Sequence, residues 1–301
     1  MKITAHCLAK NEARFIWYSL MSVINHVDRI RVWDMGSTDE TPLIIEEVAK
    51  TKEAKKLELF DFRKLGDKDF DEEELRQTML ELDAVEDKFV AAKHKMLEET
   101  RADWFLVVDA DEIWWEDSIK KVVEKIRTEG DKYDSVVVPT TNLVGDMFHY
   151  QEEKAGRYHL AGRVGHYNLR AVNRKIPGLH ARGRHGTFAW VDGNGKKIES
   201  RNQKRICYLD APYLHTTHLA RSGSRAKDGE VIKRKRKLKY ELGIPFPKDQ
   251  YFPEVFFRNK PEIVLSPWET LGNDYKAVAF LETPMRKLYR RTLLPLKKHG
   301  Y

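Results

Sequence analysis

The fold class is decided by the stretch Trp104-Phe105-Leu106-Val107-Val108-Asp109-Ala110-Asp111-Glu112. Its first five residues are all apolar, which predicts a central strand that is buried on both faces of a sheet. Three carboxylates follow within four residues, where such a strand would leave the sheet. Ligands of open α/β sheets bind beyond the carboxyl ends of the strands. The stretch therefore predicts both a parallel sheet and a polar site at its edge.

The chain before this stretch alternates strand-like and helix-like patterns, and the alternation continues to about residue 140. Strands are predicted at 2–9, 29–33, 57–62, 104–108 and 135–139, and helices at 12–26, 41–52, 71–99 and 118–127. Such alternation indicates an α/β fold in which helices flank a mainly parallel, Rossmann-like sheet.

The second half of the chain has a different character. After residue 140 the sequence is rich in Gly, His, Arg and aromatic residues and contains only short strand-like pieces, followed by a predicted basic helix at 227–240. We therefore expect two halves without a clear linker: residues 1–140, which carry the acidic motif, and an irregular α+β half at 141–301.

Composition excludes several classes of protein. The 301 residues include 54 Lys and Arg and 47 Asp and Glu, a net charge of +7, and 41% are hydrophobic, which is typical of a globular chain and not of a disordered one. No apolar run approaches the roughly 18–20 residues that span a bilayer, and the first residues do not resemble a signal peptide. The two cysteines, Cys7 and Cys207, make neither a disulfide framework nor a four-ligand zinc site by themselves. These features favour a cytoplasmic protein.

The acidic motif itself suggests a metal. Asp109 and Asp111 point the same way if strand geometry persists through them, and two carboxylates that close repel each other unless a cation lies between them. Oxygen ligands of this kind suit Mg²⁺ or Mn²⁺, which in turn bind substrate phosphates. The alternative is a solvated acidic loop that precedes a helix, where carboxylates favour the helix dipole.

Polar loops also follow the first two predicted strands. Lys10-Asn11-Glu12 follows the first, and Asp34-Met35-Gly36-Ser37-Thr38-Asp39 follows the second. Parallel strands bring such loops to one edge of the sheet. A Gly-Ser loop with carboxylates suits a nucleoside, whose hydroxyls and base can donate to the carboxylates.

Four motifs in order resemble those of glycosyltransferase family 2, whose members have the GT-A fold. They are Leu8-Ala9-Lys10-Asn11-Glu12, Val32 to Thr41, Ala91-Ala92-Lys93-His94, and Asp109-Ala110-Asp111, which resembles the DxD motif. The resemblance implies a metal-dependent enzyme that transfers a sugar, with inversion, from a nucleotide-diphosphate sugar to an acceptor hydroxyl. A glycan or a lipid-linked sugar would be the acceptor, as in polysaccharide or glycolipid synthesis.

The same resemblance assigns roles to individual residues. The donor nucleotide would be bound by Ala9, Glu12, Asp34, Asp39, Lys93 and Asp109, and the Mn²⁺ or Mg²⁺ ion by Asp109, Asp111 and a histidine of the second half, either His215 or His218. Two positions depart from the family pattern. Lys93 stands where many members have Arg, and it lacks the bidentate fork of Arg. Met35 stands where many have a second Asp, which weakens the case for a uridine nucleotide.

The catalytic base is the least constrained role. Inverting transfer requires a group that deprotonates the acceptor hydroxyl. A related branch of the family has a His-Glu pair after an Arg-rich strand; here the histidine is His185, and the Glu position is Gly186. We expect His185 as the first candidate and Asp192 as the second.

Basic residues are concentrated late in the chain. The run between Arg221 and Lys239 is either a solvated helix face or a surface for anionic groups, such as the donor diphosphate or a phosphate-bearing lipid acceptor. Nucleic acid is not expected as a partner, because stacking aromatics do not alternate with the charges. Residues 285–298 combine basic residues with Leu and Tyr at helical spacing. They predict a terminal helix packed on its own domain or one that lies peripherally on an anionic inner membrane face.

Other functions remain open at this point. A sugar-1-phosphate nucleotidyltransferase would need a glycine-rich loop after the first strand, and Lys10-Asn11-Glu12 has no glycine. A phosphatase that used Asp109 as its nucleophile would carry this motif at the first strand of the fold. A non-catalytic glycan- or partner-binding protein of the same fold is the third alternative.

Overall fold

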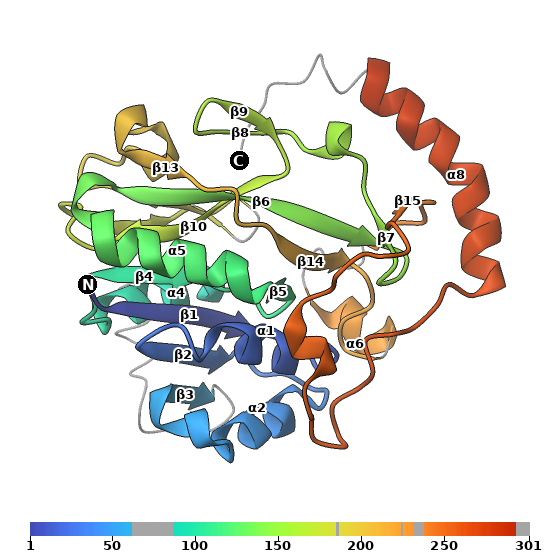
Figure 1. Ribbon diagram of the computed structural model, residues 1–301, viewed down its shortest axis with the longest axis horizontal. Coiled ribbons are helices and arrows are strands. Elements are labelled where there is room, and N and C mark those ends of the chain that lie inside the picture. Colours follow the sequence, from blue (N-terminus) through green and yellow to red (C-terminus); the bar gives the residue numbers. More distant parts are fainter. Residues whose placement is uncertain (62–86, 185–186, 224, 232–237, 293–301) are drawn as a thin grey trace.

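A computed structural model describes residues 1–61, 87–184, 187–223, 225–231 and 238–292. Its centre is an 11-stranded sheet in which eight strands follow the order β15-β7-β6-β10-β4-β1-β2-β3 (Figure 1). The prediction of an α/β fold with a Rossmann-like sheet flanked by helices is confirmed.

The first half builds a block of four parallel strands. These are β1 (Ile3–Ala9), β2 (Arg29–Asp34), β3 (Leu57–Asp61) and β4 (Trp104–Val107), with β1 paired to both β2 and β4. The connecting helices are α1 (Ile16–Val23), α2 (Thr41–Ala49), α4 (Lys88–Glu98) and α5 (Glu116–Glu129), and the short 3₁₀ turns are η1 (Lys52–Lys56) and η3 (Gly130–Lys132).

The second half completes the sheet with antiparallel and shorter strands. β10 (Tyr167–Asn173) lies antiparallel between β4 and β6 (Ser135–Val144), and β14 (Tyr213–His218) joins β6 to β5 (Glu112–Trp114). The outer strands are β7 (His149–Tyr150), β13 (Ile206–Tyr208) and β15 (Ile244–Pro245). Two small hairpins pair β8 (Tyr158–Leu160) with β9 (Arg163–Gly165) and β11 (His180–Arg182) with β12 (Ala189–Val191). The remaining elements are α6 (Arg225–Glu230), α8 (Asn273–Thr292) and the 3₁₀ turns η4 (Glu153–Ala155), η5 (Ile198–Ser200), η6 (Gln203–Arg205) and η7 (Glu254–Phe257).

The apolar run of β4 is buried on both faces, as its sequence predicts. Trp104, Leu106 and Val108 pack in the core that holds α1, α2 and α5. Phe105 and Val107 pack in a second core together with residues of α4 and of the β11–β12 hairpin. Alternate side chains of one strand thus serve two layers, which fixes the register of β4 and the position of the acidic residues that follow it.

Two expectations about helices meet different outcomes. The predicted helix at 71–99 is described only from Lys88, where α4 begins; its earlier part lies outside the described residues. The predicted basic helix at 227–240 is confirmed for residues 227–230, which lie in α6, and is wrong for Val231 and residues 238–240, which are not helical; residues 232–237 lie outside the described residues. The hydroxyl of Tyr275 donates to the carbonyl of Lys239 in this segment, so α8 holds the backbone in an irregular path.

Candidate active site

The loops after β1 and β2 are bonded directly to each other. Ala9 lies opposite Asp34 in the strand register, and the backbone N–H of Asn11 donates to Ser37 Oγ over 2.8 Å. In return, Asn11 Oδ1 accepts from the backbone N–H of Thr38 at 2.8 Å. Asn11 has a φ of 54°, a left-handed conformation that asparagine tolerates better than most residues. The two loops therefore form one rigid rim at the carboxyl edge of the sheet.

The carboxylates predicted for the nucleoside pocket lie in this rim, and two of them stabilise it. Asp34 is buried and accepts from the backbone N–H and the hydroxyl of Ser37. Asp39 accepts from the backbone N–H groups of Ala13 at 3.2 Å and Thr41 at 3.0 Å. Both carboxylates thus have structural partners besides any ligand.

Asp109 lies just past the end of β4 between two cations. Its carboxylate is 3.7 Å from Lys93 Nζ and 3.5 Å from an Arg170 nitrogen. Burial favours the neutral acid, but Lys93 and Arg170 outweigh it and hold the pKa of Asp109 below its ordinary value. Lys93 is itself buried and lies over the rings of Phe89 and Phe188, so its ammonium has a fixed position.

Arg170 also serves the third carboxylate of the motif. Glu112 is fully buried on β5 and accepts from the Arg170 guanidinium. Burial raises the pKa of Glu112 well above its ordinary value, and the charge of Arg170 opposes that shift. Glu112 therefore belongs to the support beneath the site, whereas the side chain of Asp109 is partly exposed.

Asp111 is the point at which the two halves of the chain meet. Its backbone carbonyl accepts from the N–H of Thr216 at 2.9 Å, and its Oδ2 lies 3.3 Å from Nε2 of His215. The antiparallel pairing of β14 with β5, which places His215 opposite Glu112, brings the histidine to this position. Of the two histidines predicted as ligands, the structure brings His215 to Asp111.

Arg221 supplies the cation that neutralises Asp111. One of its terminal nitrogens bonds to Asp111 Oδ2 and lies 3.1 Å from Oε1 of Glu12. The side chain is buried, and Nε has no hydrogen-bond partner among the described residues. The two carboxylates outweigh the effect of burial and raise the pKa of Arg221. A buried guanidinium with an unsatisfied donor is suited to an anionic ligand such as a diphosphate.

The short helix α6 connects Arg221 to the rim. Asp228 accepts from the backbone N–H groups of Arg221 and Ser222 at 3.3 Å. From the same helix, the carbonyl of Lys227 accepts from the Asn11 side chain at 2.9 Å, and Glu230 accepts from the Thr38 hydroxyl at 2.6 Å. In Figure 1 the arrowheads of β1 and β2 point toward this helix.

The residues present fit a divalent cation that is shared with a substrate. Ligand bonds of about 2.1 Å at right angles place two donor atoms about 3 Å apart, close to the 3.3 Å between Asp111 Oδ2 and His215 Nε2. Among the described residues, no group of three or more His, Cys, Asp or Glu side chains could hold a metal without other ligands. One or two protein ligands plus substrate phosphates is the usual arrangement for Mg²⁺. Asp111 and His215 would hold such an ion, with Asp109 nearby.

The other predicted site residues lie elsewhere. His218 lies three residues after His215 on β14, and it contacts Gln151 Oε1 at 3.2 Å and Lys239 Nζ at 3.3 Å. Asp192 accepts from the Arg201 guanidinium and from two backbone N–H groups of its own turn. His185 lies outside the described residues. The roles of Asp192 and His185 as the base remain predictions.

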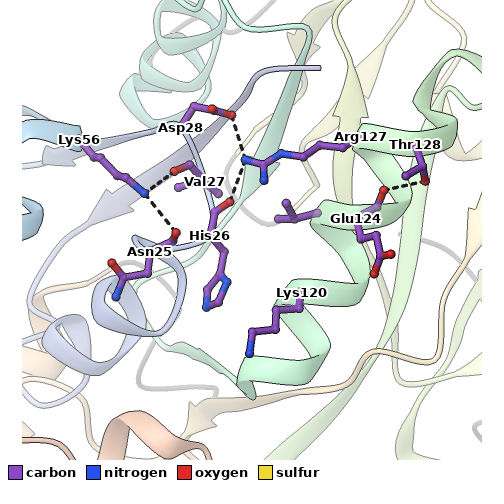
Figure 2. Close-up of a pocket in the computed structure, with 10 residues that line it drawn as sticks. Asn25, His26, Val27, Asp28, Lys56, Lys120, Glu124, Arg127 and Thr128 are labelled. Atoms are coloured by element: carbon purple, nitrogen blue, oxygen red, sulfur yellow. Dashed lines mark hydrogen bonds and ion pairs between the residues drawn. The ribbon is translucent and has the colours of Figure 1, made fainter.

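A groove of about 620 Å³ lies at the opposite edge of the sheet, away from Asp111 and His215 (Figure 2). Its cations are bound to the protein: Lys56 donates to the carbonyls of Asn25 and Val27, and Arg127 contacts Asp28 and the carbonyl of His26. None of the helices in the described part of the chain is long and apolar enough to cross a membrane.

Comparison with known proteins agrees with this geometry. Residues 78–191 match the sequence model of the family described as Glycosyl transferase family 2. This segment of the chain is similar to family 2 glycosyltransferases. The matched segment includes Lys93, Asp109, Asp111 and Arg170, and it ends before His215 and Arg221. No curated protein matches the chain.

Two solved structures illustrate the range of similar folds. Glucosyl-3-phosphoglycerate synthase from Mycobacterium tuberculosis, in complex with Mn²⁺, UDP and glucosyl-3-phosphoglycerate, is 18% identical, with 71% of each chain covered and a TM-score of 0.42. S. aureus TarS 1–349, in complex with UDP-GlcNAc, is 14% identical, with 72% of this chain and 58% of that chain covered and a TM-score of 0.42.

Sequence reasoning missed the roles of Arg221 and Arg170. Arg221 is counted there within a basic run, although it lies 110 residues from Asp111 in sequence and bonds to it in the fold. Arg170 is noted only as part of an Arg-rich strand, yet it contacts both Asp109 and Glu112. The available signal is that each arginine lies in or next to a buried strand, where an arginine needs an anionic partner.

Proposed function

We propose that the protein transfers a sugar from a nucleotide-diphosphate sugar to an acceptor hydroxyl, with a divalent cation held by Asp111 and His215. The observation that carries the proposal is the 3.3 Å approach of these two side chains at the carboxyl edge, beside the rim formed by the loops after β1 and β2. A bound cation would neutralise the leaving diphosphate. The family match favours glycosyl transfer over nucleotidyl transfer.

The protein's own cations have a defined part in this proposal. Lys93, Arg170 and Arg221 are all buried and each contacts Asp109 or Asp111, so a diphosphate at these carboxylates would meet three buried positive charges. The unsatisfied Nε of Arg221 would gain an acceptor from a phosphate oxygen. The rim with Ala9, Glu12, Asp34 and Asp39 would hold the nucleoside. Inversion at the anomeric carbon belongs to the proposal, as does acceptor deprotonation by His185 or Asp192.

Turnover of a nucleotide-sugar panel with Mn²⁺ tests the function. The wild type should release a nucleoside diphosphate from at least one donor, and Asp111→Asn should reduce this at least 100-fold, whereas Asp117→Asn on the surface of α5 should not. A parallel thermal-shift panel of UDP, GDP, dTDP and CMP, with and without Mn²⁺, would identify the base, because a ligand that binds only the native state raises its stability. Absence of both turnover and nucleotide binding for every donor would reject the enzyme function.

We also propose that α8 contacts an anionic membrane surface peripherally. Val278, Leu281, Met285 and Leu288 form a stripe at helical spacing with 39–74% of each side chain exposed. On the opposite face, Arg290 is buried in ion pairs with Glu241 and Glu152, so the helix is held with its stripe outward. Figure 1 shows α8 along the outer side of the molecule.

The charge beside the stripe favours a membrane over a second apolar surface. The helical repeat places Arg291 beside the stripe, about 60° around the helix from Leu288. At about 1 kcal/mol per basic residue near an anionic surface, such a residue would strengthen binding about fivefold. The protein should therefore float with liposomes that contain phosphatidylglycerol and not with neutral ones. Leu281→Ser combined with Leu288→Ser should abolish flotation. The control Leu43→Ser, at an exposed leucine of α2, should not. Equal flotation of all variants would refute the contact.

A further inference from the structure

A continuous line of polar groups leads from the backbone of Glu152 to His215. The Glu152 carbonyl lies 3.1 Å from Nε2 of His166, and Nδ1 of His166 lies 2.8 Å from Nδ2 of Asn142. Oδ1 of Asn142 then lies 3.2 Å from Nδ1 of His215, whose Nε2 faces Asp111. These contacts join three nearby segments, at residues 142, 152 and 166, to His215, which lies 73 residues beyond Asn142.

The direction of every hydrogen bond in this line follows from its first member. A backbone carbonyl can only accept, so Nε2 of His166 carries the hydrogen. The amide nitrogen of Asn142 can only donate, so Nδ1 of His166 accepts from it, and burial, which lowers the pKa of His166, agrees with this. The Asn142 oxygen is then turned toward His215 and accepts from its Nδ1–H. Nδ1 of His215 thus carries a hydrogen, and Nε2 is the nitrogen that faces Asp111.

The backbone holds these groups in place independently of any ligand. Asn142 on β6 lies directly opposite His215 in the register of β14. The carbonyl of His166 accepts from the backbone N–H of Thr140 at 2.8 Å, which joins the segment before β10 to the same part of β6. The carbonyl of Asn142 accepts from the backbone N–H of Gln151, next to Glu152. Strand pairing thus sets the spacing of all four members.

We propose that Asn142 and His166 are positioning residues that hold His215 in its Nδ1–H tautomer, with Nε2 available to a divalent cation. This inference rests on the proposed function, because the proposed function includes the cation site at Asp111 and His215. A histidine that binds a metal through one nitrogen normally donates its other N–H to a fixed acceptor, and loss of that acceptor weakens metal affinity about 10–100-fold. Here the acceptor is an amide oxygen whose orientation is set by His166.

The first test measures the tautomers directly. Long-range ¹H–¹⁵N NMR spectra of the wild type, assigned with His166→Gln and His215→Gln variants, should show hydrogen on Nε2 of His166 and on Nδ1 of His215. Asn142→Ala should move hydrogen of His215 to Nε2, which still faces the Asp111 carboxylate. A wild-type His215 with its hydrogen on Nε2 would overturn the proposal whether or not the protein binds metal.

The second test measures Mn²⁺ affinity by electron paramagnetic resonance without any donor. Asn142→Ala should weaken binding about 10–100-fold, while Asn142→Asp, which keeps an oxygen acceptor for His215, should stay within about threefold of the wild type. Asn173→Ala is the matched control, because Asn173 is buried on β10 and caps the carbonyls of Gly130 and Tyr133. Wild-type affinity in Asn142→Ala would refute the positioning role. No Mn²⁺ binding by the wild type would instead refute the proposed cation site. The NMR spectra would then still decide whether Asn142 and His166 set the tautomer of His215.

Discussion

Replacement of Arg221 by methionine should destabilise the metal-free protein and make its stability depend on Mn²⁺. Arg221 is the cation shared by Asp111 and Glu12, and the side chains of the three residues are only 5–8% exposed. Loss of one member of a buried ion pair costs about 3–5 kcal/mol, because the remaining charge stays buried without its partner. Since His215 remains beside Asp111, we expect a loss at the lower end, about 3 kcal/mol.

Divalent cations should reverse most of this loss. A ligand at 100 times its Kd stabilises the native state by about 2.7 kcal/mol. In Arg221→Met, Mn²⁺ meets two carboxylates with no competing guanidinium, whereas in the wild type it must displace Arg221 from Asp111. Mn²⁺ should therefore stabilise the variant more than the wild type.

Urea unfolding at pH 7.5, with and without Mn²⁺, measures both effects. Arg258→Met is the control: Arg258 pairs with Glu116 at 3.2 Å, but both side chains are about one-third exposed, so the loss should stay below about 1 kcal/mol. If Arg221→Met were as stable as the wild type without metal, the role of Arg221 as the shared cation of Asp111 and Glu12 would be refuted. Equal stabilisation of both proteins by Mn²⁺ would show that Arg221 and the cation do not compete.

Three further predictions concern other parts of the molecule. Burial lowers the pKa of His6 well below 6.5, so the unfolded chain binds a proton at a higher pH than the native state does. The free energy of unfolding therefore falls as the pH drops below 6.5, by up to about 1.4 kcal/mol per pH unit. In urea unfolding, His6→Gln should lose less stability per pH unit on the acid side than the wild type. Gly178 and Gly162 both have positive φ, but a Cβ at Gly178 would lie 2.5 Å from the Gly193 backbone and one at Gly162 would meet nothing within 4 Å. Gly178→Ala should thus lower the free energy of unfolding by about 2 kcal/mol more than Gly162→Ala, and equal losses would contradict this. Lys93→Met should weaken nucleoside diphosphate binding about tenfold or more in calorimetry, while Lys120→Met on the surface of α5 should leave it unchanged.

The sequence was sufficient for the sheet and for the position of its acidic edge. The five apolar residues at 104–108 have to be buried on both faces, and this demand alone places Asp109 and Asp111 beyond a central strand. The loops after β1 and β2 could be placed at the same edge because parallel strands end together, and the register of Ala9 with Asp34 confirms it.

Contacts between the two halves could not be derived in this way. Both His215 and His218 are compatible with a ligand in sequence, and only the pairing of β14 with β5 and β6 distinguishes them. The bond of Arg221 to Asp111 depends on a turn held by Asp228, and the run around residues 227–240 looks helical because its composition favours helix. Local propensity does not encode these long-range hydrogen bonds, so the structure was needed to find them.

The most direct test of the account is a count of Mn²⁺ ions bound in the presence of a nucleoside diphosphate. Electron paramagnetic resonance titration of the wild type with Mn²⁺ and the diphosphate selected by the thermal-shift panel should give one bound ion per chain. Asp111→Asn and His215→Gln should each weaken its binding at least tenfold, and Asp117→Asn should not. Binding by Asp111→Asn that equals that of the wild type would contradict the assignment of the cation to Asp111 and His215.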